Sequence, residues 1–218
     1  REVMEKAERL RYIGLFATGY NNIDTEYAVK KGITVCNAGS YSTEAVAQQV
    51  FAYILSHYTK LEQYNKLVHS GGWITSPNFS MLTYPTDELF GKSLGLIGCG
   101  SIGTAVARIA NAFGMKVSAF VRSPRSIPGV TCVSLDELLA ESDIVSVHCP
   151  LNAESENMFN AEAFNKMKNG AYFINTARGA IVDDNALLAA LSSGKLSGAA
   201  IDVLKQEPMA SDCILLNA

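Results

Sequence analysis

Short apolar runs alternate with amphipathic stretches along the second half of the chain. Strands are predicted at 94–97, 116–121, 143–148, 171–175 and 197–203, and helices at 104–113, 134–140, 160–168 and 184–193. Strands that alternate with helices form parallel sheets whose two faces are covered by right-handed crossovers. The pattern therefore predicts an α/β fold with a doubly wound parallel sheet.

The chain before residue 90 has a different pattern. Strands are predicted at 11–17 and 33–37, with a short helix between them that Asp24 can cap. An apolar stripe at helical spacing then runs from Ser42 to about Ser70. At about 1.5 Å per residue, a helix over 42–70 is long enough to link two domains. An arm at 71–90 follows, and its aromatic side chains favour a subunit contact over a solvent loop.

A glycine-rich turn joins the strand at 94–97 to the helix at 104–113, with the sequence Gly98-Cys99-Gly100-Ser101-Ile102-Gly103. In a dinucleotide-binding turn the first glycine permits the tight turn, the second lets the backbone approach the pyrophosphate, and the third lets the helix pack on the strand. The pyrophosphate binds the first free N–H groups of the helix. The motif alone is also compatible with a turn that binds no ligand. With the surrounding alternation, it predicts a Rossmann-like domain with cofactor contacts from Gly98, Gly100, Ser101, Ile102 and Gly103.

Polar residues follow the last two predicted strands. Asn175-Thr176-Ala177-Arg178-Gly179 comes after one, Asp202 ends the other, and Glu207 lies just beyond it. In a doubly wound sheet these positions face the ligand crevice. An arginine there can simply cap carbonyl groups or pair with a surface acid. Beside a cofactor crevice, its fork also suits a substrate that carries a carboxylate.

Composition narrows the choice of partners and compartment. The 218 residues are 48% hydrophobic and 18% charged, with a net charge of −3, and they contain no apolar run of membrane length. We therefore expect no nucleic-acid partner and no membrane partner. The five cysteines have no CxxC spacing and no nearby histidine cluster, so we expect no metal site. Reduced thiols favour the cytoplasm.

The chain resembles the D-isomer-specific 2-hydroxyacid dehydrogenases, most closely the glycerate dehydrogenase/hydroxypyruvate reductase group. The resemblance covers nearly the whole sequence. Besides the glycine turn it rests on ATGYNNID (17–24), YSTEAVAQQVFA (41–52), HCPLNAESENMFN (148–160), NTARGAIVDDNAL (175–187) and AIDVLKQEP (200–208).

The resemblance implies roles for individual residues. Arg178 would hold the substrate carboxylate and polarise the keto oxygen, and Glu207 would orient an acid/base histidine and raise its pKa. Thr18 and Gly19 match the loop whose backbone N–H groups bind the substrate carboxylate. The remaining matches are to the cofactor: Asp202 and the backbone of Ala177 at the nicotinamide carboxamide, and Cys149 and Pro150 at the adenine side.

The family's catalytic histidine lies a short distance past the glutamate, and no histidine of this sequence matches it. His57, His69 and His148 fall on the long helix and at a strand end. We expect residues 1–42 to be a remnant of a flavodoxin-like substrate domain and residues 43–218 to be the NAD(P)-binding domain. Such a fragment is expected to bind cofactor and to be inactive, or nearly so, by itself.

The end of the second strand predicts which cofactor is bound. NAD-preferring members of the family carry an acidic residue where this chain has Val121, and Arg122 and Ser123 follow. A guanidinium and a hydroxyl suit the 2′-phosphate of NADP, which a carboxylate would repel. NADP(H) is therefore favoured, with NAD(H) possible. The alternative is that Arg122 only stacks on adenine or points to solvent.

These features predict an oxidoreductase that transfers hydride between NAD(P)H and a small 2-keto acid. Hydroxypyruvate and glyoxylate are the expected substrates, giving D-glycerate and glycolate, and phosphoglycerate, lactate or formate dehydrogenase activity stays open. A nicotinamide-sensing, corepressor-like binding protein is the alternative from another class. The 42–70 helix and the arm predict a homodimer.

Overall fold

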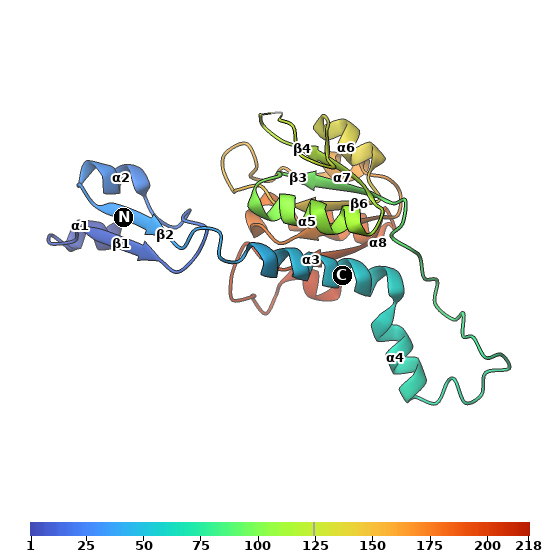
Figure 1. Cartoon of the computed structure of the whole chain (residues 1–218). Coiled ribbons are helices and arrows are strands. Elements are labelled where there is room, and N and C mark those ends of the chain that lie inside the picture. The colour runs from blue at the N-terminus through green and yellow to red at the C-terminus, as the bar shows by residue number, and fades with distance from the viewer. Residues whose placement is uncertain (124) are drawn as a thin grey trace. The chain divides into compact units, whose positions relative to one another are not determined.

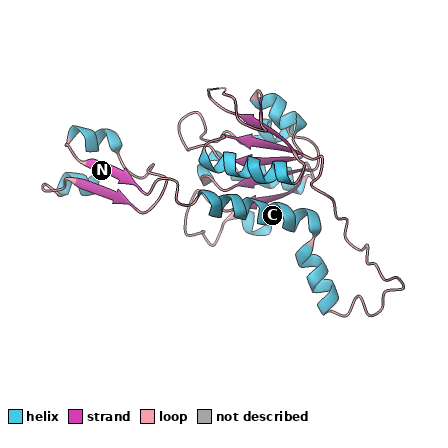
Figure 2. Ribbon diagram, viewed as in Figure 1, coloured by secondary structure: helices cyan, strands magenta, loops and turns pink. Residues whose placement is uncertain are grey.

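The computed structural model describes residues 1–123 and 125–218, which form two compact units, Arg1–Ala45 and Val46–Ala218. The elements of both are traced in Figure 1 and coloured by type in Figure 2. Among the described residues, no helix combines the length and the apolar character needed to cross a membrane.

The first unit is a small two-stranded layer. It contains α1 (Glu2–Lys6), β1 (Tyr12–Leu15), α2 (Thr25–Lys30) and β2 (Thr34–Asn37), and the two strands pair in parallel. The Asp24 carboxylate accepts a hydrogen bond from the Tyr27 N–H at 2.9 Å and so caps α2. Met4, Ala28 and Ile33 form its core. The strand–helix–strand order agrees with the one predicted from the sequence.

The second unit is built on a six-stranded parallel sheet with the order β5-β4-β3-β6-β7-β8. Its strands are β3 (Ser93–Ile97), β4 (Lys116–Phe120), β5 (Thr131–Cys132), β6 (Ile144–Val147), β7 (Ala171–Asn175) and β8 (Leu196–Ile201). From β3 the chain first builds outward through β4 and β5, then crosses back to β6. The predicted doubly wound sheet is confirmed, and its strand order reverses between the paired strands β3 and β6, the point at which such folds bind their ligands. The two-residue β5 was missed because it is too short to show an alternation.

Helices cover both faces of this sheet, as Figure 1 shows. On one face α3 (Thr43–Thr59) and α5 (Ser101–Ala112) pack on a core that includes Ile54, Leu94 and Val106. On the other, α6 (Leu135–Glu141), α7 (Ala161–Lys166) and α8 (Asp184–Ser192) pack on a core that includes Phe173. Two short 3₁₀ helices, Gly179–Ile181 and Ile214–Asn217, were not predicted.

The single helix predicted over 42–70 is wrong. The structure has α3 and a separate α4 (Leu61–His69), divided at Lys60, which adopts a left-handed backbone with φ of 53°. The apolar spacing continues past Lys60, and lysine is itself a good helix former, so the local sequence does not mark the break. However, α3 buries Ala47, Val50, Phe51 and Ile54 against the sheet, whereas α4 has no buried residue. No packing therefore holds α4 in line with α3.

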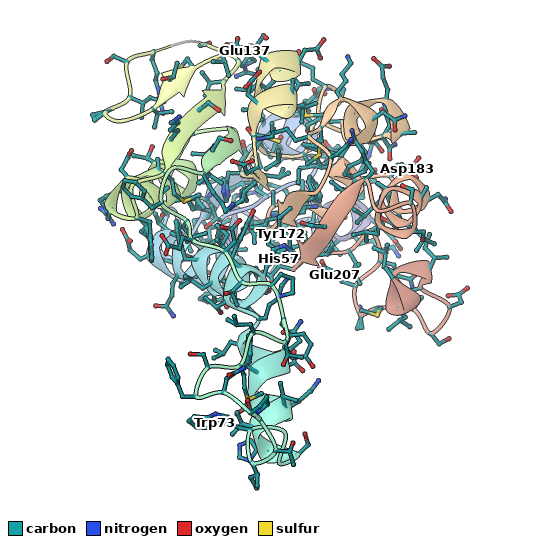
Figure 3. The ribbon with its side chains drawn as sticks, turned by 90° about the vertical axis from the view of Figure 1, so that its right-hand side faces the viewer. His57, Trp73, Glu137, Tyr172, Asp183 and Glu207 are labelled. Atoms are coloured by element: carbon teal, nitrogen blue, oxygen red, sulfur yellow. The ribbon has the colours of Figure 1, made fainter. Side chains whose placement is uncertain are left out.

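The arm at 71–90 contains no helix or strand and returns along α4 to β3. The Tyr64 hydroxyl donates to the Tyr84 carbonyl at 2.8 Å, and the Asp87 N–H donates to the Tyr58 carbonyl at 3.1 Å. Figure 3 shows Trp73 beside α4, away from the sheet. The arm is thus anchored at its return end.

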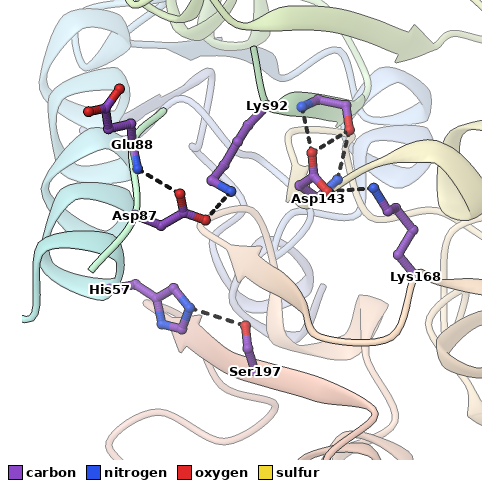
Figure 4. A network of polar contacts seen from close by, with 8 residues as sticks. His57, Asp87, Glu88, Lys92, Asp143, Lys168 and Ser197 are labelled. Carbon is purple, nitrogen blue, oxygen red and sulfur yellow. Dashed lines mark hydrogen bonds and ion pairs between the residues drawn. The ribbon is translucent and has the colours of Figure 1, made fainter. Parts of the chain in front are cut away.

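Charged pairs close the edge of the sheet at which its strands begin, as Figure 4 shows. Lys92 pairs with Asp87, and Lys168 pairs with Asp143, whose carboxylate also accepts from the Ser93 N–H at 2.8 Å. His57 stacks on Tyr172 with ring centroids 4.0 Å apart, and both are labelled in Figure 3. Burial and the Lys60 charge lower the pKa of His57 to about 4. This edge joins α3 to the sheet and lies opposite the ligand crevice.

Candidate functional site

The three glycines of the turn differ in what a side chain would meet at each position. Gly98 has φ of +92°, and a Cβ there would lie 3.0 Å from the Cys149 N. A Cβ on Gly103 would lie 2.5 Å from the Gly98 carbonyl oxygen, whereas one on Gly100 would meet nothing within 4 Å. Gly98 and Gly103 are therefore required by packing, and Gly100 borders open space.

The N-terminus of α5 borders that space. Gly100 is the N-cap residue and supplies no side-chain cap, and no acidic residue stands in the first turn. The turn itself is held in place because the Gly98 N–H donates to the Phe120 carbonyl at 2.9 Å and the His148 N–H donates to the Ile97 carbonyl at 2.8 Å. A fixed, uncapped helix end of this kind suits a phosphate group.

Asn175, the last residue of β7, organises the polar side chains at the next strand ends. Its fully buried side chain accepts from the Ala177 N–H at 3.0 Å and donates to the Arg178 carbonyl at 2.9 Å. Its own carbonyl accepts from the Asp202 N–H at 3.0 Å. The Asn175 side chain therefore fixes the backbone of Ala177 and Arg178, and its main-chain carbonyl fixes that of Asp202. Sequence analysis grouped Asn175 with its neighbours but missed this role.

The Arg178 guanidinium is partly buried, and its Nη1 donates to the Ala177 carbonyl at 2.6 Å. The following Gly179 lies directly against the Leu204 carbonyl group, where a Cβ would overlap it. The segment after β8 is thus packed onto the loop after β7. Glu207 belongs to this segment and accepts from the Leu204 N–H at 2.9 Å. The structure therefore brings Ala177, Arg178 and Asp202 together and places Glu207 on the adjoining segment.

Thr176 carries a buried hydroxyl for which the described residues supply no partner. A buried hydroxyl without a hydrogen bond is costly, so its place beside Asn175 and Ala177 indicates a position completed by a ligand.

The residues after β4 lie at the same edge of the sheet. Val121 packs against the core, whereas Arg122 and Ser123 are exposed. Arg125 Nη2 donates to the Cys99 carbonyl at 2.7 Å, so the Arg125 guanidinium helps to hold the glycine turn. The predicted 2′-phosphate residues thus stand beside the turn at an accessible strand end.

The residues after β6 form the other wall of the turn. Cys149 packs against the second core cluster, and Pro150 is exposed. Burial raises the pKa of the Cys149 thiol and of the Cys99 thiol, so both remain protonated. Burial also lowers the pKa of His148 to about 4, and its ring lies 3.0 Å from the Ser146 hydroxyl. The wall of the turn formed after β6 is therefore uncharged at neutral pH.

The predicted substrate residues Thr18 and Gly19 belong to the first unit. The Thr18 hydroxyl donates to the Gly39 carbonyl at 2.7 Å, and Asn37 Nδ2 donates to the Thr18 carbonyl at 2.7 Å. The loop after β1 is therefore tied to the loop after β2.

The family is decided by comparison with known proteins. Residues 51–218 match the family described as D-isomer specific 2-hydroxyacid dehydrogenase, NAD binding domain. The chain belongs to this family. A nicotinamide cofactor is therefore the group expected at the glycine turn, and the uncapped α5 terminus, the open space at Gly100 and the unpartnered Thr176 hydroxyl fit it.

Individual relatives of this dehydrogenase domain carry several activities. The hydroxypyruvate reductase of Blautia hydrogenotrophica is 41% identical over 222 residues, a match that covers 100% of this chain and 69% of the relative. An acyclic imino acid reductase solved in complex with NADPH and D-Arg has a TM-score of 0.90 at 34% identity, covering 99% of this chain and 68% of that one. A D-lactate dehydrogenase of Aquifex aeolicus solved with NAD and lactic acid has a TM-score of 0.89 at 38% identity, covering 99% and 67%. The chain thus spans about two thirds of these proteins.

Among the described residues of this family member, no group of three or more His, Cys, Asp or Glu side chains is placed to hold a metal ion. The five cysteines are all free thiols.

Proposed function

We propose that residues 43–218 bind a nicotinamide cofactor and present it to a small 2-keto acid that Arg178 holds. Residues 1–42 belong, in this proposal, to the substrate domain. The observation that carries it is the hydrogen bonding of Asn175, which fixes Ala177, Arg178 and Asp202 together at the carboxyl ends of β7 and β8.

In this proposal, separate groups of residues hold the pyrophosphate, the adenine and the nicotinamide of the cofactor. Gly98, Gly100, Ser101, Ile102 and Gly103 surround its pyrophosphate at the N-terminus of α5. Cys149 and Pro150 border the adenine side. The Ala177 backbone and the Asp202 carboxylate receive the nicotinamide carboxamide. When bound, the nicotinamide supplies the hydride.

Arg178 acts on the substrate. Its guanidinium pairs with the carboxylate of the keto acid and stabilises the negative charge that develops on the keto oxygen. The backbone N–H groups of Thr18 and Gly19 also bind the substrate carboxylate in this proposal.

The proton comes from an acid/base histidine held by Glu207. The histidines of this chain lie elsewhere: His57 stacks on Tyr172, His69 ends α4, and the His148 ring lies against Ser146. We therefore expect residues 1–218 by themselves to bind the cofactor and to catalyse little or no reduction.

Hydroxypyruvate and glyoxylate are the proposed substrates, in line with the Blautia hydrogenotrophica reductase. The test follows oxidation of the reduced cofactor by the full-length protein with hydroxypyruvate, glyoxylate and pyruvate. Faster turnover of the first two supports the proposal. Preference for pyruvate refutes the substrate assignment, and absence of cofactor binding refutes the function.

NADP(H) is the proposed cofactor. Val121 carries no charge to repel a 2′-phosphate, and Arg122 and Ser123 are exposed beside the turn. One solved relative holds NADPH and another holds NAD, so the proposal rests on the residues after β4. Arg122→Ala should weaken NADPH binding by about tenfold or more, the equivalent of one charge-assisted hydrogen bond, and leave NADH binding unchanged. Lys116→Ala, at the other end of β4, is the matched control. Equal loss for both cofactors, or none, would refute the role of Arg122.

We also propose that the protein is a homodimer joined through the arm. Large apolar side chains of 71–90 are exposed, namely Trp73, Ile74, Phe79, Leu82 and Phe90, with Phe79 at 92%. Sedimentation should give twice the monomer mass, and the double variant Phe79→Asp/Leu82→Asp should be monomeric. Val29→Asp, at an exposed site outside the arm, should leave the mass unchanged. A monomeric wild-type protein would refute the proposal.

A further inference from the structure

Asp202 stands at the end of the site and is exposed, so its side chain depends on neighbours for a fixed orientation. Its N–H is held by the Asn175 carbonyl at 3.0 Å, immediately past the last residue of β8. The residue follows the carboxyl end of β8. Backbone pairing alone leaves the side-chain torsions of such a residue free.

Tyr53 supplies the missing restraint. Its hydroxyl lies 2.7 Å from Asp202 Oδ1 and donates to it, although the two residues are 149 positions apart. Tyr53 is on α3, whose neighbouring Val50 and Ile54 are fully buried, and its ring packs against the same core. The phenol is therefore held by a helix that cannot shift easily, and it holds the carboxylate in turn.

The Tyr53 phenol keeps the proton that it needs to donate to Asp202. Burial and the hydrogen bond to Asp202 raise the pKa of Tyr53, and Gln49 lowers it in part. The proton thus stays on the phenol at neutral pH, so Tyr53 is the donor and Asp202 an acceptor. An O–H···O⁻ bond of this kind is short and roughly twice as strong as a bond between neutral groups.

We propose that Tyr53 is a positioning residue that occupies Oδ1 of Asp202 and leaves Oδ2 directed at the nicotinamide carboxamide. An ionised carboxylate accepts through both oxygens, so one bond to the phenol does not prevent a second to the amide N–H. Fixing the carboxylate in advance reduces the entropy lost on binding. The inference rests on the proposed function, because it requires Asp202 to receive the carboxamide.

The experiment compares Tyr53→Phe with wild type in binding two reduced cofactors, followed by nicotinamide fluorescence. One is NADPH, and the other is its 3-acetylpyridine analogue, in which a methyl group replaces the amide nitrogen and cannot donate. Tyr53→Phe should weaken NADPH binding by about tenfold, the equivalent of one hydrogen bond, and leave analogue binding unchanged. Tyr58→Phe, on the same helix, is the matched control and should bind both like wild type.

The outcomes separate the inference from the proposed function. Equal weakening for both cofactors would show that the Tyr53 hydroxyl only supports the fold, and unchanged NADPH binding would show that it is unnecessary. Either result overturns the inference and leaves the proposed function standing. A wild-type chain that binds neither cofactor refutes both. Equal melting temperatures of the cofactor-free wild type and Tyr53→Phe confirm that folding is intact.

Discussion

Two alanine substitutions in the glycine turn separate cofactor binding from stability. Gly100→Ala adds a methyl group that meets nothing within 4 Å in the cofactor-free protein, at an ordinary φ of −75°. Gly103→Ala adds the same group 2.5 Å from the Gly98 carbonyl oxygen. The first methyl would occupy the approach of the pyrophosphate, and the second would force α5 away from β3.

The magnitudes follow from these contacts. At Gly103 the carbonyl must retreat by about 0.9 Å to reach ordinary contact. Such overpacking costs about 1–3 kcal/mol of unfolding free energy, and alanine returns about 1 kcal/mol through its helix propensity. At Gly100 the poorer N-cap costs about 0.5–1 kcal/mol. Losing one hydrogen bond to the pyrophosphate should weaken cofactor binding by about 10- to 150-fold.

The assays are urea unfolding of the cofactor-free chain and fluorescence titration with NADPH. Gly100→Ala should lose at most about 1 kcal/mol of unfolding free energy and should bind the cofactor more weakly, whereas Gly103→Ala should lose up to about 2 kcal/mol of unfolding free energy. Wild-type affinity in a folded Gly100→Ala variant would refute the placement of the pyrophosphate at the α5 terminus.

Three further predictions concern the strand ends. Asn175→Ala removes the side-chain bonds to Ala177 and Arg178, so urea unfolding should show a loss of about 1–3 kcal/mol and fluorescence titration a weaker cofactor complex; wild-type values for both would contradict the role of Asn175. Gly179→Ala places a methyl group on the Leu204 carbonyl and should cost about 1–3 kcal/mol in the same unfolding assay; an unchanged unfolding free energy would contradict the packing of the segment after β8 on the loop after β7. His148 stays neutral in the folded chain down to its pKa of about 4, whereas the unfolded chain takes up the proton near 6.5. The unfolding free energy should therefore fall as the pH drops from about 6.5 to 4. The pKa of His57 is lowered in the same way, so His148→Gln should remove only about half of that slope, and an unchanged slope would assign it to His57 and other groups.

Local sequence patterns determined the type of fold and the position of the cofactor turn. The alternation of strands and helices can be read directly from the order of apolar and polar residues, because each strand of a covered parallel sheet must be apolar and each helix amphipathic. The glycines at 98, 100 and 103 are read from one short motif, although the closest neighbour of Gly98 is the Cys149 backbone after β6, and only Gly103 has its closest neighbour within the turn itself. Helix caps are also local: the Asp24 cap was predicted, and in the structure the side chains of Asp24, Ser134 and Asn160 each accept a hydrogen bond from a backbone N–H of the first turn.

Only the tertiary structure decided where the 42–70 helix breaks and how the site is held. Helical spacing continues through Lys60, but packing against the sheet stops there, and no short-range signal marks that limit. Gly179 and Leu204, and likewise Tyr53 and Asp202, come together only because α3 and the ends of β7 and β8 meet at one edge of the sheet. The sequence, through its resemblance to a family, predicts which residues carry the chemistry. Which partners orient them depends on contacts between distant segments, which the chain makes only when the core has formed.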